Sequence, residues 1–259
     1  MNRRKFRKQS LLPPLSILFG LTLWEILVRV SNYPAFILPA PSRIFMRFVT
    51  ANQSGLLLYH TGVTFVEVLS GMLIGAVFAL LLGYLLAHSK VAEKVLFPYL
   101  VASQAIPTAA IAPLLIIWFG AGYFPKILIC SLTVFFPLLI NVLVGYQSIE
   151  RNLSDLMTSM NASRWDRLRY LEIPGTMPVV LGGLKISATL SVIGAVVGEL
   201  TGSNAGLGYL INVARGQYDT AMVFVAVITL MCMAVFLYSV VGFAEKRVLK
   251  WKKVTHGIS

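Results

Sequence analysis

Charged residues are scarce in this chain of 259 residues, of which only 12% are Asp, Glu, Lys or Arg. A soluble domain carries roughly a quarter. Acidic residues are the scarcest, with ten against 22 Lys and Arg. This shortage of charged residues excludes a large soluble domain, because the surface of such a domain would have to be covered largely by apolar side chains. Because 57% of the chain is hydrophobic and its mean hydropathy is +0.79, the composition indicates a polytopic membrane protein.

Cysteine and histidine are also nearly absent. Cys130 and Cys232 both fall within apolar runs, and His60, His88 and His256 are scattered. Neither set has the spacing of a metal site or of a disulfide framework. The chain also lacks a glycine-rich loop ending in Lys-Ser or Lys-Thr, which would cradle nucleotide phosphates. We therefore expect no metal, no bound cofactor and no catalytic site in this chain.

Six apolar runs are each close to the ~20 residues that a helix needs to cross about 30 Å of hydrocarbon. They cover residues 14–30, 64–87, 95–119, 124–146, 177–200 and 220–243. The predicted fold is therefore all-α, a single domain over residues 1–259 with six transmembrane helices. A cleaved signal peptide is the alternative for the first run. We expect a retained helix, because Trp24 and Glu25 interrupt the run and no small-x-small cleavage site follows.

The net charge of +12 is distributed as the positive-inside rule requires. Lys and Arg gather in the N-terminal segment, in the second connection, in the loop 147–176 and in the tail. These residues are Arg3, Arg4, Lys5, Arg7 and Lys8; Lys90 and Lys94; Arg151, Arg164, Arg167 and Arg169; and Lys246, Arg247, Lys250, Lys252 and Lys253. Both termini and the loop are therefore expected in the cytoplasm. The basic tail favours contact with anionic lipid over contact with nucleic acid.

Between the first two spans, three prolines predict an extended stretch before a short amphipathic helix at about 42–50. Its apolar face favours a helix lying on the outer leaflet, and contact with a ligand is the alternative.

Small residues recur every four positions in the second and fifth spans. They are Gly71, Gly75, Ala79 and Gly83 in one span and Gly183, Ser187, Ser191 and Ala195 in the other. Such stripes let a neighbouring helix approach closely, so we expect both at packing interfaces. A more specific hypothesis is that Ser187 and Ser191 lie near a second copy of the protein, around a shared pathway.

Prolines divide the third span at Pro98, Pro107 and Pro113. Each removes a helix hydrogen bond and obstructs the preceding turn, so the helix should be bent or broken. Broken membrane helices usually line a cavity, and Gln104 and Thr108 would then face it as part of the pathway. A kinked packing helix is the alternative.

Four ionisable residues fall within or at the edges of spans: Glu25, Glu67, Lys185 and Glu199. A charge at the bilayer centre costs roughly 2.5–3.5 kcal/mol on insertion scales. Glu67 and Glu199 are expected near the external helix ends, within reach of headgroups, and Lys185 can extend its stem toward cytoplasmic water. Glu25 is expected to make a contact inside the bundle, and Glu199 is a further pathway candidate.

The polar loop between the fourth and fifth predicted spans is expected to form two short helices joined by a turn. Ser154 or Asn152 can cap a short helix that runs to about Asn161, which tolerates the left-handed backbone of a turn. Ser163 and Asp166 have the spacing of a capping box that opens a second helix.

That second helix is expected to end before Pro174, because the residue preceding a proline avoids the helical region. The two helices should expose apolar side chains, which favours either a socketed contact with a partner or packing on the membrane surface. The side chains concerned are Leu156, Met157, Met160 and Trp165.

The loop also resembles the docking loop of ABC importer permeases. That family's pattern is E-A-A, three residues, Gly, nine residues, then I-x-L-P. The same spacing here, with most residue types substituted, gives Asp155, Leu156 and Met157, then Asn161, then Leu171, Ile173 and Pro174.

A second resemblance covers nearly the whole chain. The run GELTGSNAGLGYLI at 198–211 is similar to permeases of the taurine, sulfonate, nitrate and thiamine-precursor group, as are APLLIIWFG at 112–120 and LPAP at 38–41. The resemblance implies a homodimer in a prokaryotic cell membrane, an extracytoplasmic solute-binding protein, and two ATP-binding subunits that use the ATP. These subunits would dock on Asp155, Leu156, Met157, Met160, Asn161, Ser163, Trp165, Leu171, Ile173 and Pro174.

The resemblance leans toward vitamins or their precursors, such as a thiamine pyrimidine or riboflavin. Aromatic side chains at Phe119, Tyr123, Phe135 and Phe136 would suit a flat heterocycle. The alternatives are an importer of sulfonate, taurine or nitrate, and a proton-coupled secondary transporter that uses the carboxylates in the spans. The second alternative is weakened because no inverted repeat is visible. Scattered histidines without a carboxylate cluster disfavour a membrane-embedded enzyme.

Overall fold

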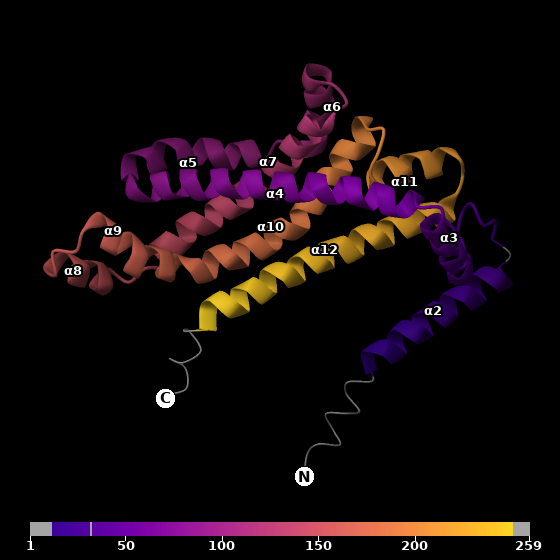
Figure 1. The fold of residues 1–259 in the computed structure, drawn as a ribbon, viewed down its shortest axis with the longest axis horizontal. Helices are drawn as coiled ribbons and strands as arrows, with labels where there is room; N and C mark the ends of the chain where they lie inside the picture. The colour runs from indigo at the N-terminus through magenta and orange to yellow at the C-terminus, as the bar shows by residue number, and fades with distance from the viewer. Residues whose placement is uncertain (1–11, 32, 251–259) are drawn as a thin grey trace, which may run out of the picture.

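The computed structural model describes residues 12–31 and 33–250, and all regular structure in this part is helical (Figure 1). The basic residues expected at the N-terminus, Lys252, Lys253 and His256 lie outside the described residues. The elements are α2 (Leu12–Val30), α3 (Pro41–Gln53), α4 (Leu56–His88), α5 (Lys90–Gln104), α6 (Thr108–Phe119), α7 (Tyr123–Gln147), α8 (Arg151–Ser159), α9 (Arg164–Arg167), the π-helix η1 (Leu168–Glu172), α10 (Ile173–Gly202), α11 (Leu207–Gly216) and α12 (Thr220–Val248). The all-α fold class is confirmed.

The long helices α4, α7, α10 and α12 lie alongside one another and form the body of the molecule (Figure 1). Helix α7 packs against both α4 and α10, and α12 packs against α10 and α11. Helices α8 and α9 lie at one end of the bundle, which we call the loop end. Helices α3 and α11 lie at the other, which we call the α11 end (Figure 1).

The number of spans differs from the prediction of six. Among the described residues, α4, α7, α12 and the continuous helix 164–202 are long and apolar enough to cross a membrane alone. The α5–α6 pair would add a fifth span if its two halves cross together. Helix α2, which carries both Glu25 and Arg29, is not in that count and lies at the edge of the bundle (Figure 1).

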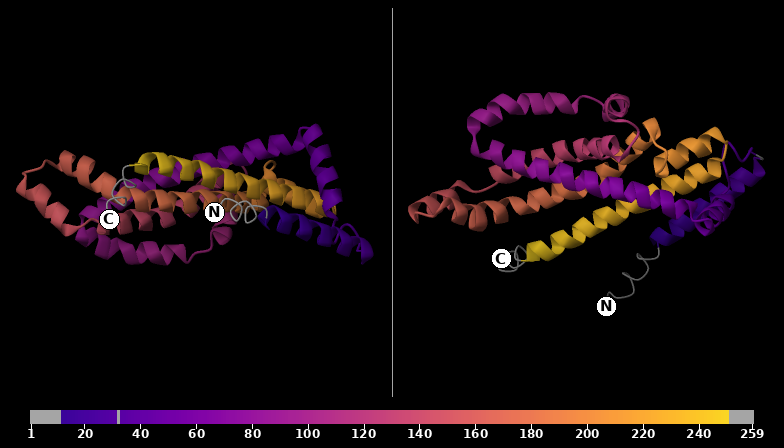
Figure 2. Two further views of the ribbon diagram at one scale, coloured as in Figure 1. Left: turned by 90° about the horizontal axis from the view of Figure 1, so that it is seen from below. Right: turned by 45° about the horizontal axis from the view of Figure 1, so that its top comes forward.

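The third predicted span is broken, as its prolines indicate. Helices α5 and α6 meet at 91° across residues 105–107. Helix α5 runs back along α4, and α6 turns sharply away from it (Figure 2). Pro98 and Pro113 are accommodated inside their helices, so the break is localised at Pro107, which has no N–H to continue the helix.

The two stripes of small residues, one on α4 and one on α10, both pack against α7. A Cβ atom on Gly75 would lie 2.5 Å from the Ser131 carbonyl oxygen, and one on Gly183 would lie 2.6 Å from the Asn141 Cβ. Such approaches leave no room for a side chain at either glycine, so Gly75 packs against the backbone of α7 and Gly183 packs against the Asn141 side chain. The packing interpretation of both stripes is confirmed.

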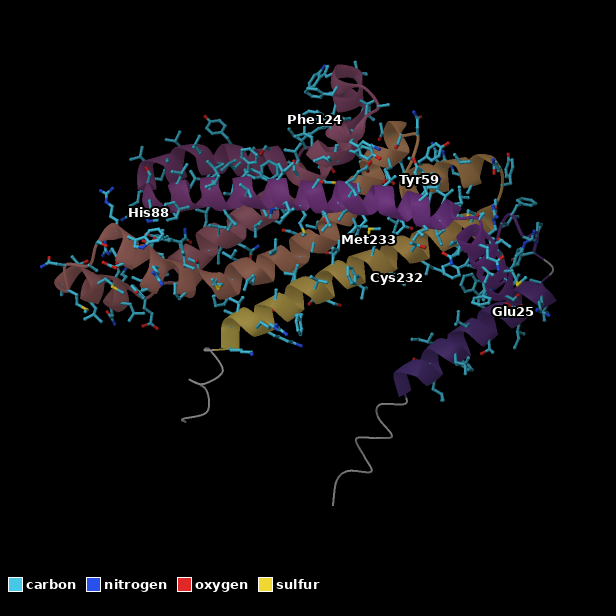
Figure 3. The ribbon with its side chains drawn as sticks, viewed as in Figure 1. Glu25, Tyr59, His88, Phe124, Cys232 and Met233 are labelled. Carbon is cyan, nitrogen blue, oxygen red and sulfur yellow. The ribbon has the colours of Figure 1, made fainter. Side chains whose placement is uncertain are left out.

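Helix α2 is tied to α3 rather than to the bundle interior. One oxygen of Glu25 accepts a hydrogen bond from the Ser42 N–H at 3.0 Å, and the other accepts one from the Ser42 hydroxyl at 2.8 Å and pairs with Arg29 at 2.7 Å (Figure 3). A carboxylate at the first turn of α3 complements the helix dipole. The expectation that Glu25 contacts the bundle core is therefore wrong, whereas the helix predicted at 42–50 is present as α3.

Candidate functional site

The loop end presents α8 and α9 as a compact pair. Helix α8 begins at Arg151, with the Glu150 carbonyl accepting the first backbone hydrogen bonds. Asn152 and Ser154 therefore lie inside the helix, and the expectation that either of them caps it is wrong. Asp155 lies in its second turn and is exposed.

The turn between α8 and α9 has the predicted chemistry. Asn161 adopts the left-handed conformation, with φ at 51°. The Ser163 hydroxyl accepts the Asp166 N–H at 3.2 Å, and the Asp166 carboxylate accepts the Ser163 N–H at 3.2 Å, so the capping box is confirmed. Arg167 then clamps the pair by donating to the Ser154 carbonyl at 3.0 Å and to the Thr158 hydroxyl at 2.7 Å.

The second loop helix does not end before Pro174. Helix α9 passes through η1 directly into α10, which gives one helical segment over residues 164–202. The expectation of a stop was wrong because the π-helical turn, with its wider hydrogen-bonded ring, accommodates a residue that has no N–H. Leu171 lies in η1, and Ile173 and Pro174 open α10. The loop end is thus joined to a membrane helix without a flexible connection.

Three of the four predicted apolar side chains are exposed on this surface. Leu156 is 56% exposed, Met160 69% and Trp165 66%. Met157 is half-buried. Asn161, Ser163 and Ile173 are also exposed, whereas Leu171 and Pro174 are half-buried. Three large apolar groups on short, mutually clamped helices form a surface that can enter a socket on a partner; we call them the docking triad.

The loop end is also fastened to the end of α4. The ring of His88 lies 3.1 Å from the Glu172 carboxylate through Nε2 (Figure 3). The same ring contacts Tyr84 and Tyr146 in tilted arrangements, with centroid distances of 4.2 and 4.9 Å. Reasoning from the sequence missed this contact, because the two partners are 84 positions apart and neither belongs to the loop pattern alone.

Near the α11 end lies a buried polar group that we call the carboxylate cluster: Thr64, Glu67, Lys126 and Glu199. Glu67 is 0% and Glu199 is 1% exposed, so the expectation that they reach headgroups is wrong. Lys126 Nζ lies 2.5 Å from Glu67 Oε1 and also donates to the Ser203 hydroxyl at 2.9 Å. The cluster therefore joins α4, α7 and α10 through buried charges.

The carboxylate cluster also fixes the segment that leads into α11. One oxygen of Glu199 accepts the Thr64 hydroxyl at 2.6 Å, and the other accepts the Gly208 N–H. The Thr64 hydroxyl in turn accepts the Leu207 N–H at 2.8 Å. Gly206, with φ at +112°, donates its N–H to His60 Nδ1 at 3.0 Å. Position 206 requires glycine because an L side chain rarely adopts this φ and a Cβ would overlap the Glu199 carboxylate.

The structure brings two of the five predicted pathway residues together. Gln104 and Thr108 line a cavity of about 310 Å³ between the α5–α6 break and α7, which we call the break cavity. Ser187 and Ser191 are instead fully buried in α10, where Ser187 faces the Val134 carbonyl of α7. Together with Glu199 they line no part of this cavity.

Of the four aromatic residues expected to suit a heterocycle, only Phe136 lines the break cavity. Lys185, expected to reach toward water, pairs with Glu245 of α12 at 2.6 Å and keeps part of its side chain exposed.

A bundle of apolar helices with a clamped helical loop at one end is the architecture of a polytopic membrane protein. Residues 71–250 match the sequence model described as "Binding-protein-dependent transport system inner membrane component". The chain belongs to this family, and the resemblance to ABC importer permeases is confirmed.

Three relatives match along nearly their whole length. The riboflavin transport system permease protein RibX of Chloroflexus aurantiacus is 43% identical, over 96% of this chain and 93% of its own. The formylaminopyrimidine transport permease protein ThiX of Halalkalibacterium halodurans is 34% identical, over 95% and 97%. The putative aliphatic sulfonates transport permease protein SsuC of Bacillus subtilis is 31% identical, over 98% and 91%.

Solved structures share the fold. The MetNI methionine ABC transporter in an inward-facing conformation matches with a TM-score of 0.61 at 19% identity, covering 77% of this chain and 97% of that chain. An amino acid ABC transporter crystallised with histidines matches with a TM-score of 0.56 at 18% identity, covering 78% and 96%.

Proposed function

We propose that this chain is the transmembrane subunit of an ATP-driven importer that brings a vitamin or vitamin precursor into the cytoplasm. The observation that carries the proposal is the 43% identity to a riboflavin permease over 96% of the chain, supported by the 34% identity to a formylaminopyrimidine permease. An importer of sulfonates is the second candidate, favoured by the 31% identity to SsuC.

The docking triad supports a role as the contact for an ATP-binding subunit. Leu156, Met160 and Trp165 project from helices that the Arg167 clamp and the capping box hold in place. Because η1 joins this surface directly to α10, a displacement of the loop by a closing ATPase would move a membrane helix.

The assembly that we propose contains two copies of this chain, two ATP-binding subunits and an extracytoplasmic solute-binding protein. The loop end faces the cytoplasm, since Arg151, Arg164, Arg167 and Arg169 gather there. The carboxylate cluster then lies toward the external side, where the binding protein delivers the solute.

The docking proposal is tested by purification from native membranes in mild detergent. The double variant Met160→Ala/Trp165→Ala should lose the co-purifying ATPase, because it removes two of the three projecting side chains. Tyr218→Ala, an exposed aromatic residue at the α11 end, is the matched control and should retain the ATPase. Equal recovery from both variants would show that the ATPase binds elsewhere.

The substrate is tested with the co-purifying binding protein. Isothermal titration with riboflavin, formylaminopyrimidine and an aliphatic sulfonate should give binding of one of the heterocycles only. Binding of the sulfonate alone would overturn the vitamin assignment in favour of the second candidate.

A further inference from the structure

We propose that the break cavity is a solute subsite on the permease itself, which holds an uncharged, flat heterocycle during its passage. The inference rests on the proposed function, because it takes the chain to be a vitamin-type permease. It goes beyond that function by placing part of the selectivity in the membrane subunit instead of the binding protein alone.

Polar groups without a partner in the described part of the chain gather at the break, where Gln104 is exposed and Thr108 is half-buried. The Gln104 amide and the Thr108 hydroxyl make no hydrogen bond with any described residue. The carbonyls of Ala105 and Ile106 accept none from the described backbone N–H groups, because the chain turns by 91° at the break and does not continue the helix. Polar groups without partners are costly in hydrocarbon, so this arrangement is stable only where water or a solute meets them.

The other hydroxyl groups in the cavity wall are already occupied. Ser103 donates to the Leu100 carbonyl at 2.8 Å, and Thr133 donates to the Ile129 carbonyl at 2.8 Å. Gln104 and Thr108 are therefore the two side chains in the wall whose hydrogen-bond donors are available to a solute. Gln104 offers a donor and an acceptor side by side, which matches the edge of a lactam or of an aminopyrimidine.

The remaining wall favours a flat and uncharged molecule. The ring of Phe136 supplies an aromatic face on which a heterocycle can stack. None of the side chains that line the cavity is ionisable. A sulfonate or nitrate would therefore lose its hydration without gaining a countercharge, which is unfavourable at membrane depth. The volume of about 310 Å³ is near the lower limit for small-molecule sites, so the cavity can hold the ring system of a heterocycle.

Transport by the intact complex with its ATPase and binding protein, in membrane vesicles, provides the first test. Radiolabelled riboflavin and formylaminopyrimidine are the probes. Gln104→Leu should reduce uptake of the transported probe at least ten-fold, and Gln104→Asn should restore part of it. Ser239→Ala, whose hydroxyl is bonded to the Val235 carbonyl within α12 and lies outside the cavity, is the control and should stay within two-fold of the unmodified complex.

A structural role for Gln104 would be exposed by a readout that does not depend on transport rate. In a Cys232→Ser background, Gln104→Cys should react with a water-soluble thiol reagent, and the transported probe should protect it; Cys130 is buried and should stay unlabelled. Labelling without protection, or uptake by Gln104→Leu equal to that of the control, would overturn the subsite. Failure of the proposed function is distinct, since the unmodified complex would then take up neither heterocycle.

Discussion

Lys126 is the residue on which the carboxylate cluster depends, because it is the cation paired with Glu67 at 2.5 Å in a fully buried setting. Lys126→Met would leave a buried carboxylate without its partner. We expect a loss of about 3–5 kcal/mol in the free energy of unfolding, the usual cost of breaking a buried pair on one side. Thermal unfolding of the protein purified in detergent measures this loss.

The double variant Lys126→Met/Glu67→Gln distinguishes the effect of the lost ion pair from the effect of replacing the Lys126 side chain. It removes both charges, so it should regain most of the stability that the single variant loses. A double variant no more stable than Lys126→Met would show that Lys126 acts through Ser203 or through packing instead.

At the residue scale, local chemistry was predictable and long-range pairing was not. Asn161 and the Ser163–Asp166 capping box are defined by neighbours within a few positions, and both form as expected. The environment of Glu199 depends on Thr64, which is 135 positions away. A single sequence places both residues near helix ends but cannot show that these ends meet.

Among the elements, the contact of α4 with α7 gives a direct test of backbone packing. A Cβ on Gly75 would meet the Ser131 backbone, which cannot move aside without displacing α7. Gly75→Ala should therefore cost about 1–3 kcal/mol of stability, the range for overpacked cores. Gly62→Ala lies on the same helix and its Cβ meets nothing within 4 Å, so it should be neutral or slightly stabilising. Equal unfolding midpoints for the two variants would contradict the packing interpretation.

The turn between α8 and α9 gives a second test at this scale. Asn161→Val would place a β-branched side chain at φ 51°, at a cost of roughly 1–2 kcal/mol, whereas Asn161→Gly should be tolerated. We expect limited proteolysis to cleave the loop faster in Asn161→Val and to leave Asn161→Gly close to the unmodified protein. Faster cleavage of Asn161→Gly alone would show that the asparagine side chain, and not its backbone conformation, holds the turn.

Prolines show how far the elements themselves can be predicted. Pro107 breaks its helix as expected. Pro174 does not, because the π-helical turn η1 accommodates a residue that has no N–H. Both residues have the same local effect on the chain, and the packing around each decides whether the helix continues. The break cavity could therefore be predicted from the sequence, whereas the continuous helix 164–202 could not.

For the whole molecule, one helical segment connects the docking triad with the carboxylate cluster. It starts at Arg164 in the loop end and carries Glu199 near its other end. His88 and Glu172 fasten its beginning to α4, and Thr64 and Glu199 fasten its end to the same helix. A movement imposed at the loop end would thus be transmitted along α10 and resisted by α4 at both ends.

The contacts of the carboxylates also bear on the choice between an ATP-driven importer and the proton-coupled alternative. The Glu199 oxygens are taken up by Thr64 and Gly208, and those of Glu25 by Ser42 and Arg29, so both carboxylates serve structural contacts. We expect solute uptake in intact cells to persist when the proton gradient is collapsed while glycolysis maintains ATP. Uptake should stop when ATP is depleted with the gradient preserved. If uptake instead followed the proton gradient and not ATP, the carboxylates would be candidates for a proton relay. Under ATP-driven transport, Glu25→Gln should reduce uptake only as far as it destabilises the contact between α2 and α3.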